Sequence, residues 1–116
     1  MKTKKELKAE FRSFKFRAGI FRILNKAENK IYLQTSSDLD RAFNSDLFQL
    51  NARMHSNQAL QNDWNNLGPE SFEFDVFDEI KVKETANPQE INKDLKELLE
   101  LHLTELKKHG QLLYRP

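Results

Sequence analysis

Residues 16–35, FRAGIFRILNKAENKIYLQT, decide the fold of this chain because they read as two strands joined by a tight turn. β-Branched and aromatic residues alternate with other residues up to Leu24, and they return in IYLQT, residues 31–35. The polar stretch between them, residues 25–30, contains two asparagines, which tolerate the positive φ that hairpin turns require. The stretch therefore predicts an antiparallel β-hairpin.

Apolar residues recur at helical intervals both before and after this hairpin. This spacing predicts a basic helix before the hairpin, within residues 1–15, and three helices after it, at residues 39–50, 57–67 and 89–109. Ser36 or Ser37 is the expected N-cap of the first helix after the hairpin, and Asn57 is the expected N-cap of the second.

A third strand is predicted between the last two helices. Apolar Phe72, Phe74 and Val76 alternate with acidic residues there, as in a half-buried strand. This strand must join the hairpin to bury its apolar face. The sequence thus predicts an α/β fold, with a small three-stranded antiparallel sheet flanked by helices and an extra N-terminal helix.

Length and composition limit the function classes. The 116 residues fit a single domain, 1–116, with a core over 16–114. The absence of cysteine excludes disulfides and thiolate metal sites, and the three histidines form no spaced ligand cluster. No apolar run is long enough to cross a membrane, and the basic start lacks the apolar run of a signal peptide. We therefore expect a cytoplasmic protein without a membrane partner.

The net charge of +1 argues against a uniformly basic polyanion binder, but it conceals an uneven distribution. Residues 1–17 hold seven basic and two acidic residues, a net +5, whereas residues 69–105 hold four basic and eleven acidic residues, a net −7. A basic arm of this kind can contact phosphate, with Lys4, Lys5 and Lys8 as the candidates. The alternative is a solvated helix whose charge pairs with the acidic half.

Short motifs on and after the hairpin resemble those of a known family. They are Gly19-Ile20-Phe21, Tyr32-Leu33-Gln34, a helix with Arg41, and residues 55–80, HSNQALQNDWNNLGPESFEFDVFDEI. From about Gly19 to about Tyr114 the chain resembles a GIY-YIG nuclease domain. The resemblance implies that family's fold, and a site in which a hydroxyl, an arginine and a glutamate-bound Mg²⁺ cleave a phosphodiester.

Several positions of this implied site carry other residues. Phe21 stands where the first motif has tyrosine and so lacks a hydroxyl, whereas Tyr32 keeps the tyrosine of the second motif. Gln34 replaces the glycine of the second motif. Ala42 stands at the arginine position with Arg41 beside it, and adjacent helical side chains point about 100° apart.

Two further positions of the implied site differ from the family or stay open. The helical histidine of the family corresponds to Asp46. The metal-binding glutamate corresponds to Glu100 in one register and to Leu99 in another. The helical period puts Leu99 on the apolar face and Glu100 almost opposite to it, which favours Leu99.

The sequence therefore predicts a nuclease-like domain with a degenerate site that is non-catalytic and binds nucleic acid or a protein partner. The alternative is an active DNA endonuclease with a relocated site, in which Tyr32, Arg41 and Glu100 act with Mg²⁺, Glu100 as metal ligand. The candidate DNA contacts are Lys4, Lys5, Lys8, Arg22 and Arg41.

Each candidate also has a purely structural interpretation. Tyr32 and Trp64 fit packed core residues, Arg41 fits a solvated charge, His55 fits a turn residue and His102 fits a core histidine. Leu101 and Leu103 widen the apolar arc of the last helix, so a homodimer through this helix is a further alternative.

Overall fold

The computed structural model describes residues 17–80 and 87–114. The predicted N-terminal helix and the candidate DNA contacts Lys4, Lys5 and Lys8 lie outside the described residues. The elements are β1 (Ala18–Asn25), β2 (Lys30–Ser36), α2 (Leu39–Asn51), α3 (Gln58–Leu67), a short 3₁₀ helix (Pro69–Ser71), β3 (Phe72–Ile80), α4 (Pro88–Lys108) and β4 (Leu112–Leu113). None of the described helices is long and apolar enough to span a membrane.

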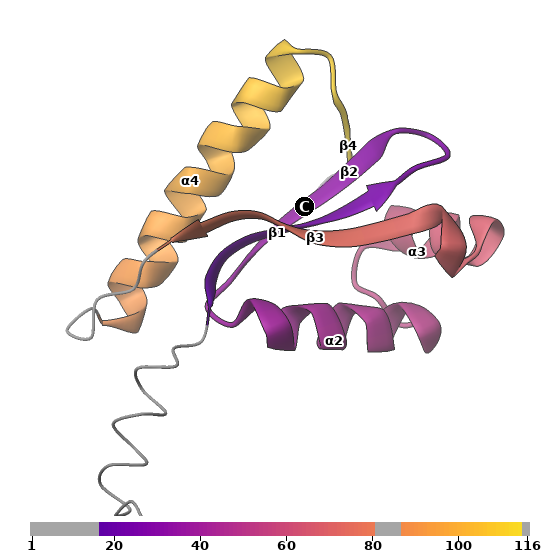
Figure 1. Cartoon of the computed structure of the whole chain (residues 1–116), viewed down its shortest axis with the longest axis horizontal. Coiled ribbons are helices and arrows are strands. Elements are labelled where there is room, and N and C mark those ends of the chain that lie inside the picture. Colours follow the sequence, from indigo (N-terminus) through magenta and orange to yellow (C-terminus); the bar gives the residue numbers. More distant parts are fainter. Residues whose placement is uncertain (1–16, 81–86, 115–116) are drawn as a thin grey trace, which may run out of the picture.

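The predicted hairpin and the third strand are confirmed. β1 pairs antiparallel with β2 in the register that joins Asn25 to Lys30, and Asn29 in the turn between them adopts a φ of 53°. β3 pairs antiparallel with the other edge of β1. The hairpin thus forms the centre of the sheet, and Figure 1 shows it between α4 on one side and α2 on the other.

The sheet has four strands in the order β3-β1-β2-β4, so the predicted count of three was wrong. After α4 the chain reverses at Gly110, where φ is 76°, and β4 runs parallel to β2. The backbone N–H of Tyr114 then donates to the carbonyl of Ile31 at 2.9 Å. β4 was missed because two leucines are too few to display a strand period.

The helices cover both faces of the sheet and enclose two apolar cores. Figure 1 shows α4 on one side of the sheet, and α2 and α3 on the other. The core under α2 and α3 contains nine buried residues, Phe21, Ile23, Tyr32, Leu39, Leu50, Leu60, Trp64, Phe72 and Tyr114. The core under α4 contains Ile20, Ile31, Leu33 and Leu99. Neighbouring strand residues alternate between the two cores, as the pleat of a strand requires.

The caps of α2 and α3 differ in how well the sequence predicted them. Asn57 caps α3 as predicted, by accepting from the N–H of Leu60 at 3.1 Å. The cap of α2 is Asp38, which accepts from the N–H of Arg41. The Ser36 hydroxyl instead accepts from the N–H of Asp38 at 3.0 Å, so it forms the turn before the helix. The predicted serine cap of α2 was therefore wrong.

Candidate functional site

The two motif positions that would supply tyrosine hydroxyls lie together on the face of the sheet under α2 and α3. Phe21 on β1 is 2% exposed and Tyr32 on β2 is 5% exposed, with their ring centres 6.2 Å apart. Phe43 of α2 packs edge-on against Phe21 with ring centres 5.7 Å apart. The position of the missing hydroxyl is thus part of a continuous aromatic core.

The arginine position of the implied site is also apolar. Ala42 packs against the core under α2 and α3. Arg41 is exposed, and its backbone N–H donates to the carboxylate of Asp38 at 3.2 Å. Arg41 precedes Ala42 on the helix, so its side chain points about 100° away from that of Ala42, which contacts the core.

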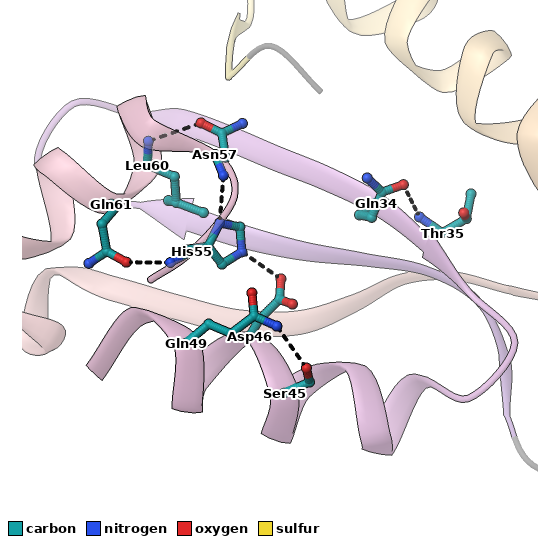
Figure 2. A network of polar contacts seen from close by, with 9 residues as sticks. All are labelled: Gln34, Thr35, Ser45, Asp46, Gln49, His55, Asn57, Leu60 and Gln61. Atoms are coloured by element: carbon teal, nitrogen blue, oxygen red, sulfur yellow. Dashed lines mark hydrogen bonds and ion pairs between the residues drawn. The ribbon is translucent and has the colours of Figure 1, made fainter. Parts of the chain in front are cut away.

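A histidine and an aspartate form a pair beside Tyr32, and Figure 2 shows the surrounding polar contacts. The His55 ring packs edge-on against the Tyr32 ring with centres 5.5 Å apart. The Nδ1 atom of His55 accepts from the N–H of Asn57 at 3.0 Å, so the ring proton resides on Nε2. Nε2 then donates to Oδ2 of Asp46 at 3.2 Å.

The backbone around His55 is fixed by Gln61. Its Oε1 accepts from the N–H of His55 at 3.0 Å, and its Nε2 donates to the carbonyl of Leu50 at 3.0 Å. Gln61 therefore ties the end of α2, the following loop and α3 together. His55 is buried and engaged through both ring nitrogens, so the prediction of a turn residue captures its place but not its contacts.

The environment of Tyr32 disfavours its ionised form. Burial raises the pKa of the Tyr32 hydroxyl, the charge of Asp46 adds to this increase, and a hydrogen bond with Gln34 partly opposes it. A phenol with a raised pKa gives up its proton less readily at neutral pH. This environment is the reverse of what a general base needs.

The two possible metal positions lie on the opposite side of the sheet from Tyr32. Leu99 on α4 is 9% exposed and packs in the core under α4, whereas Glu100 is exposed. Tyr32, Arg41 and Glu100 are therefore not brought together on one surface of the sheet. Within residues 17–80 and 87–114, no group of three or more histidines, cysteines, aspartates or glutamates is placed to hold a metal ion. In the register with Leu99, no carboxylate stands at the Mg²⁺ position that the family resemblance implies, and in the other register that position is the exposed Glu100.

Arg22, a candidate DNA contact, is engaged within the protein. It faces Asp75 across the β1–β3 pair, and its Nε donates to Oδ1 of Asp75 at 2.8 Å. Its second guanidinium nitrogen, Nη2, donates to Oδ2 of the same carboxylate, and these hydrogen bonds raise the pKa of Arg22. A bidentate pair of this kind competes with phosphate for the guanidinium group.

Two polar clusters outside the predicted site were missed by the sequence analysis. The Tyr114 hydroxyl donates to Oδ2 of Asp63 at 2.5 Å and accepts from Nδ2 of the buried Asn25 at 3.0 Å. His102 is half-buried rather than a core residue, and its Nε2 lies 2.8 Å from Oδ2 of Asp78. These partners lie 24 to 89 residues apart, so no local spacing signals them.

The two tyrosines make the protein's response to alkali predictable. Burial raises the pKa of Tyr32, and burial with the hydrogen bond to Asp63 raises that of Tyr114, above the ordinary value of 10.0. Because the folded pKa values lie above the unfolded ones, these groups contribute their full stability below about pH 10 and lose it as the pH rises further.

Tyrosinate absorbance near 295 nm measures this response directly, because Tyr32 and Tyr114 are the only tyrosines in the chain. Around pH 10 we expect few of the tyrosine hydroxyls to be ionised while the circular dichroism stays native. At higher pH the tyrosinate absorbance should rise together with the loss of the native circular dichroism signal. In denaturant both residues should titrate near pH 10. If both tyrosines ionised near pH 10 in the folded protein, that result would contradict their described burial.

Together, the four-stranded sheet and its helices on both faces define a GIY-YIG-like domain with a nuclease-like fold. The solved catalytic domain of the homing endonuclease I-TevI matches 85% of this chain and 99% of its own length, with a TM-score of 0.66 and 24% identity. A mutant of the intron endonuclease I-TevI catalytic domain matches 71% of this chain and 84% of its own, with a TM-score of 0.52 and 28% identity. A scan against protein-family models gives no match, and neither does a search of curated proteins.

These similarities confirm the sequence-based resemblance at the level of the fold. The match covers nearly the whole length of the first neighbour.

Proposed function

We propose that this chain is a GIY-YIG-like domain that binds nucleic acid without cleaving it. The observation that carries the proposal is the set of side chains at three positions of the implied site. Phe21 and Ala42 stand where the resemblance implies a hydroxyl and a guanidinium, and Leu99 stands at the carboxylate position in the register that the helical period favours. All three pack in the two apolar cores of the sheet.

Each replacement removes a separate chemical contribution. Without the guanidinium, charge that develops on the phosphate loses a bidentate donor. Without the carboxylate, a hard cation loses its anionic ligand. Removal of one such group commonly costs two to three orders of magnitude in rate, about 3–4 kcal/mol. Tyr32 retains a hydroxyl, but burial raises its pKa, so it is a poor substitute base.

The nucleic-acid part of the proposal rests on fold and charge. The neighbours in the comparison are catalytic domains of a homing endonuclease, and the first 17 residues here carry a net +5. Lys4, Lys5 and Lys8 are the proposed phosphate contacts of that segment, together with the exposed Arg41. Arg22 is a weaker candidate because Asp75 already holds its guanidinium group.

Fluorescence anisotropy with a labelled DNA duplex, measured at several salt concentrations, tests binding. We expect log K to fall linearly with log salt, and the slope to lose about 1.8 in the Lys4→Gln/Lys5→Gln variant. A double variant on α4, Lys93→Gln/Lys96→Gln, is the matched control for charge. Absence of DNA binding, or affinity independent of salt, would contradict this part of the proposal and favour a protein partner.

A further inference from the structure

The loop after α2 holds an arginine in a backbone conformation that favours glycine. Arg53 adopts a φ of 62°, in the left-handed region, where the Cβ atom of an L-residue crowds the following carbonyl oxygen. The N–H of Arg53 donates to the carbonyl of Leu50 at 3.2 Å, and the N–H of Met54 donates to the carbonyl of Gln49 at 2.9 Å. These two hydrogen bonds define a Schellman motif, in which the left-handed residue is usually glycine.

The same motif ends α4, and there the left-handed residue is a glycine. Gly110 has a φ of 76°, and its N–H donates to the carbonyl of Lys107 at 3.1 Å. The N–H of Gln111 donates to the carbonyl of Leu106 at 3.0 Å, which completes the motif. Two helices of one chain thus end in the same way with different residues at the equivalent position. Arginine at the end of α2 costs backbone strain that glycine avoids.

The Arg53 side chain makes no contact that offsets this strain. Arg53 is exposed, and its guanidinium group forms no ion pair, hydrogen bond or ring contact with any residue of 17–80 or 87–114. Positive charge after the last turn of a helix interacts favourably with the helix dipole, but at an exposed site this gain is roughly half of the left-handed strain. The described part of the fold therefore does not account for an arginine here.

Arg53 lies beside the candidate site. It precedes His55 by two residues, and the His55 ring packs on Tyr32 and donates to Oδ2 of Asp46 at 3.2 Å. Residues 47–62, which surround Arg53 in the sequence, contain no aspartate or glutamate. Asp46, just before them, is held by His55 and its side chain is only 15% exposed. An anion that approaches Arg53 therefore meets no free carboxylate on this segment.

The acidic residues on the rest of α2 and on α3 do not compete for Arg53 either. Asp38 and Asp40 lie at the opposite end of α2, roughly 17–20 Å along the helix axis from its last residue. Asp63 on α3 accepts from the Tyr114 hydroxyl at 2.5 Å. The guanidinium group of Arg53 is thus available to an external anion.

We infer that Arg53 contacts the phosphate backbone of DNA, at a position where glycine would give a more stable domain. This inference rests on the proposed nucleic-acid binding, and it places one contact in the loop after α2, beside Tyr32 and His55. A guanidinium group is planar and can donate to two phosphate oxygens at once. Contacts of this kind fix the position of the nucleic acid on the protein without selecting a sequence.

Three single variants of the whole chain test the inference. Arg53→Gly removes both the charge and the strain, whereas Arg53→Gln removes the charge and keeps the strain. Lys93→Gln removes one charge from an exposed position on α4, on the other side of the sheet, and is the matched control. Anisotropy with a labelled duplex at several salt concentrations gives the affinity, and melting followed by circular dichroism gives the Tm.

We expect both Arg53 variants to bind DNA about fivefold more weakly near 0.15 M salt, with a slope of log K against log salt that is shallower by about 0.9. Lys93→Gln should bind like the wild type. Arg53→Gly should raise the Tm by about 2–5 °C, whereas Arg53→Gln should leave it within about 2 °C of the wild type. A gain in stability together with a loss of affinity is the result that a purely structural arginine would not give.

The failures of the inference and of the proposed function differ. DNA binding that is unchanged in both Arg53 variants would overturn the inference and leave the proposed function standing. No DNA binding by the wild type would overturn both. An equal loss in Lys93→Gln would indicate a response to net charge alone and would overturn the inference. A lower Tm for Arg53→Gly than for the wild type would show that the side chain supports the fold, and would also overturn it.

Discussion

Replacement of Phe21 by alanine is expected to lower the free energy of unfolding by about 3–5 kcal/mol, the usual cost of removing a buried aromatic ring. The side chain is 2% exposed, and its ring contacts those of Tyr32 and Phe43. Its removal leaves a cavity between β1 and α2, because a close-packed interior collapses only partly around a void. Urea denaturation followed by circular dichroism measures the change.

Phe48→Ala is the matched control for this substitution. Phe48 lies on α2, close in sequence to Phe43, but its side chain is 66% exposed. The same chemical change there should alter stability by less than about 0.5 kcal/mol. Equal, small effects of the two substitutions would show that Phe21 is not a core residue, and would remove the main structural argument for a degenerate site.

Replacement of Gly19 by alanine is expected to lower the free energy of unfolding by about 1–3 kcal/mol or more. Gly19 pairs with Glu79 on β3, beside the register shift between Ile20 and Phe21. A Cβ atom at Gly19 would collide with the backbone carbonyl of Asp78 and lie 2.8 Å from the Cα of Glu79. Because both neighbours are backbone atoms within a paired strand, no side-chain rotation can relieve the contact.

Gly110→Ala separates this steric clash from backbone strain. Gly110 has a φ of 76°, but an added Cβ meets no atom within 4 Å. Alanine there should cost only the strain of a left-handed conformation, about 1–2 kcal/mol. A loss for Gly19→Ala that is smaller than the loss for Gly110→Ala would contradict the close approach of β3 to β1.

The strand and helix patterns that the sequence displays locally were predictable. The hairpin follows from alternating apolar residues and a polar turn, and the α3 cap follows from Asn57. β3 extends to Ile80, beyond the predicted end at Val76. The register shift opposite Ile20 and Phe21 places Phe77 in the core under α4, which ends the simple alternation.

The sequence predicts which residues occupy the candidate site better than it predicts the contacts that these residues make. The sequence alone identifies Phe21, Tyr32 and Ala42 at positions of the implied site, and it leaves the metal position open between Leu99 and Glu100. The helical period indicates that Leu99 points inward and Glu100 outward, which agrees with their burial in the structure. The pair of Asp46 and His55 depends on how α2 ends and how the next loop returns to Tyr32. That return is a tertiary arrangement, and no spacing rule in the sequence encodes it.

The most direct test of the central claim is cleavage of supercoiled plasmid and linear duplex DNA by the purified chain with Mg²⁺ or Mn²⁺. Tyr32→Phe and a chelator serve as controls, because Tyr32 retains the one hydroxyl among the two motif tyrosine positions. We predict DNA binding without metal-dependent nicking, at the same background level in the wild type and in Tyr32→Phe. Metal-dependent nicking that disappears in Tyr32→Phe would contradict the account and establish an active nuclease.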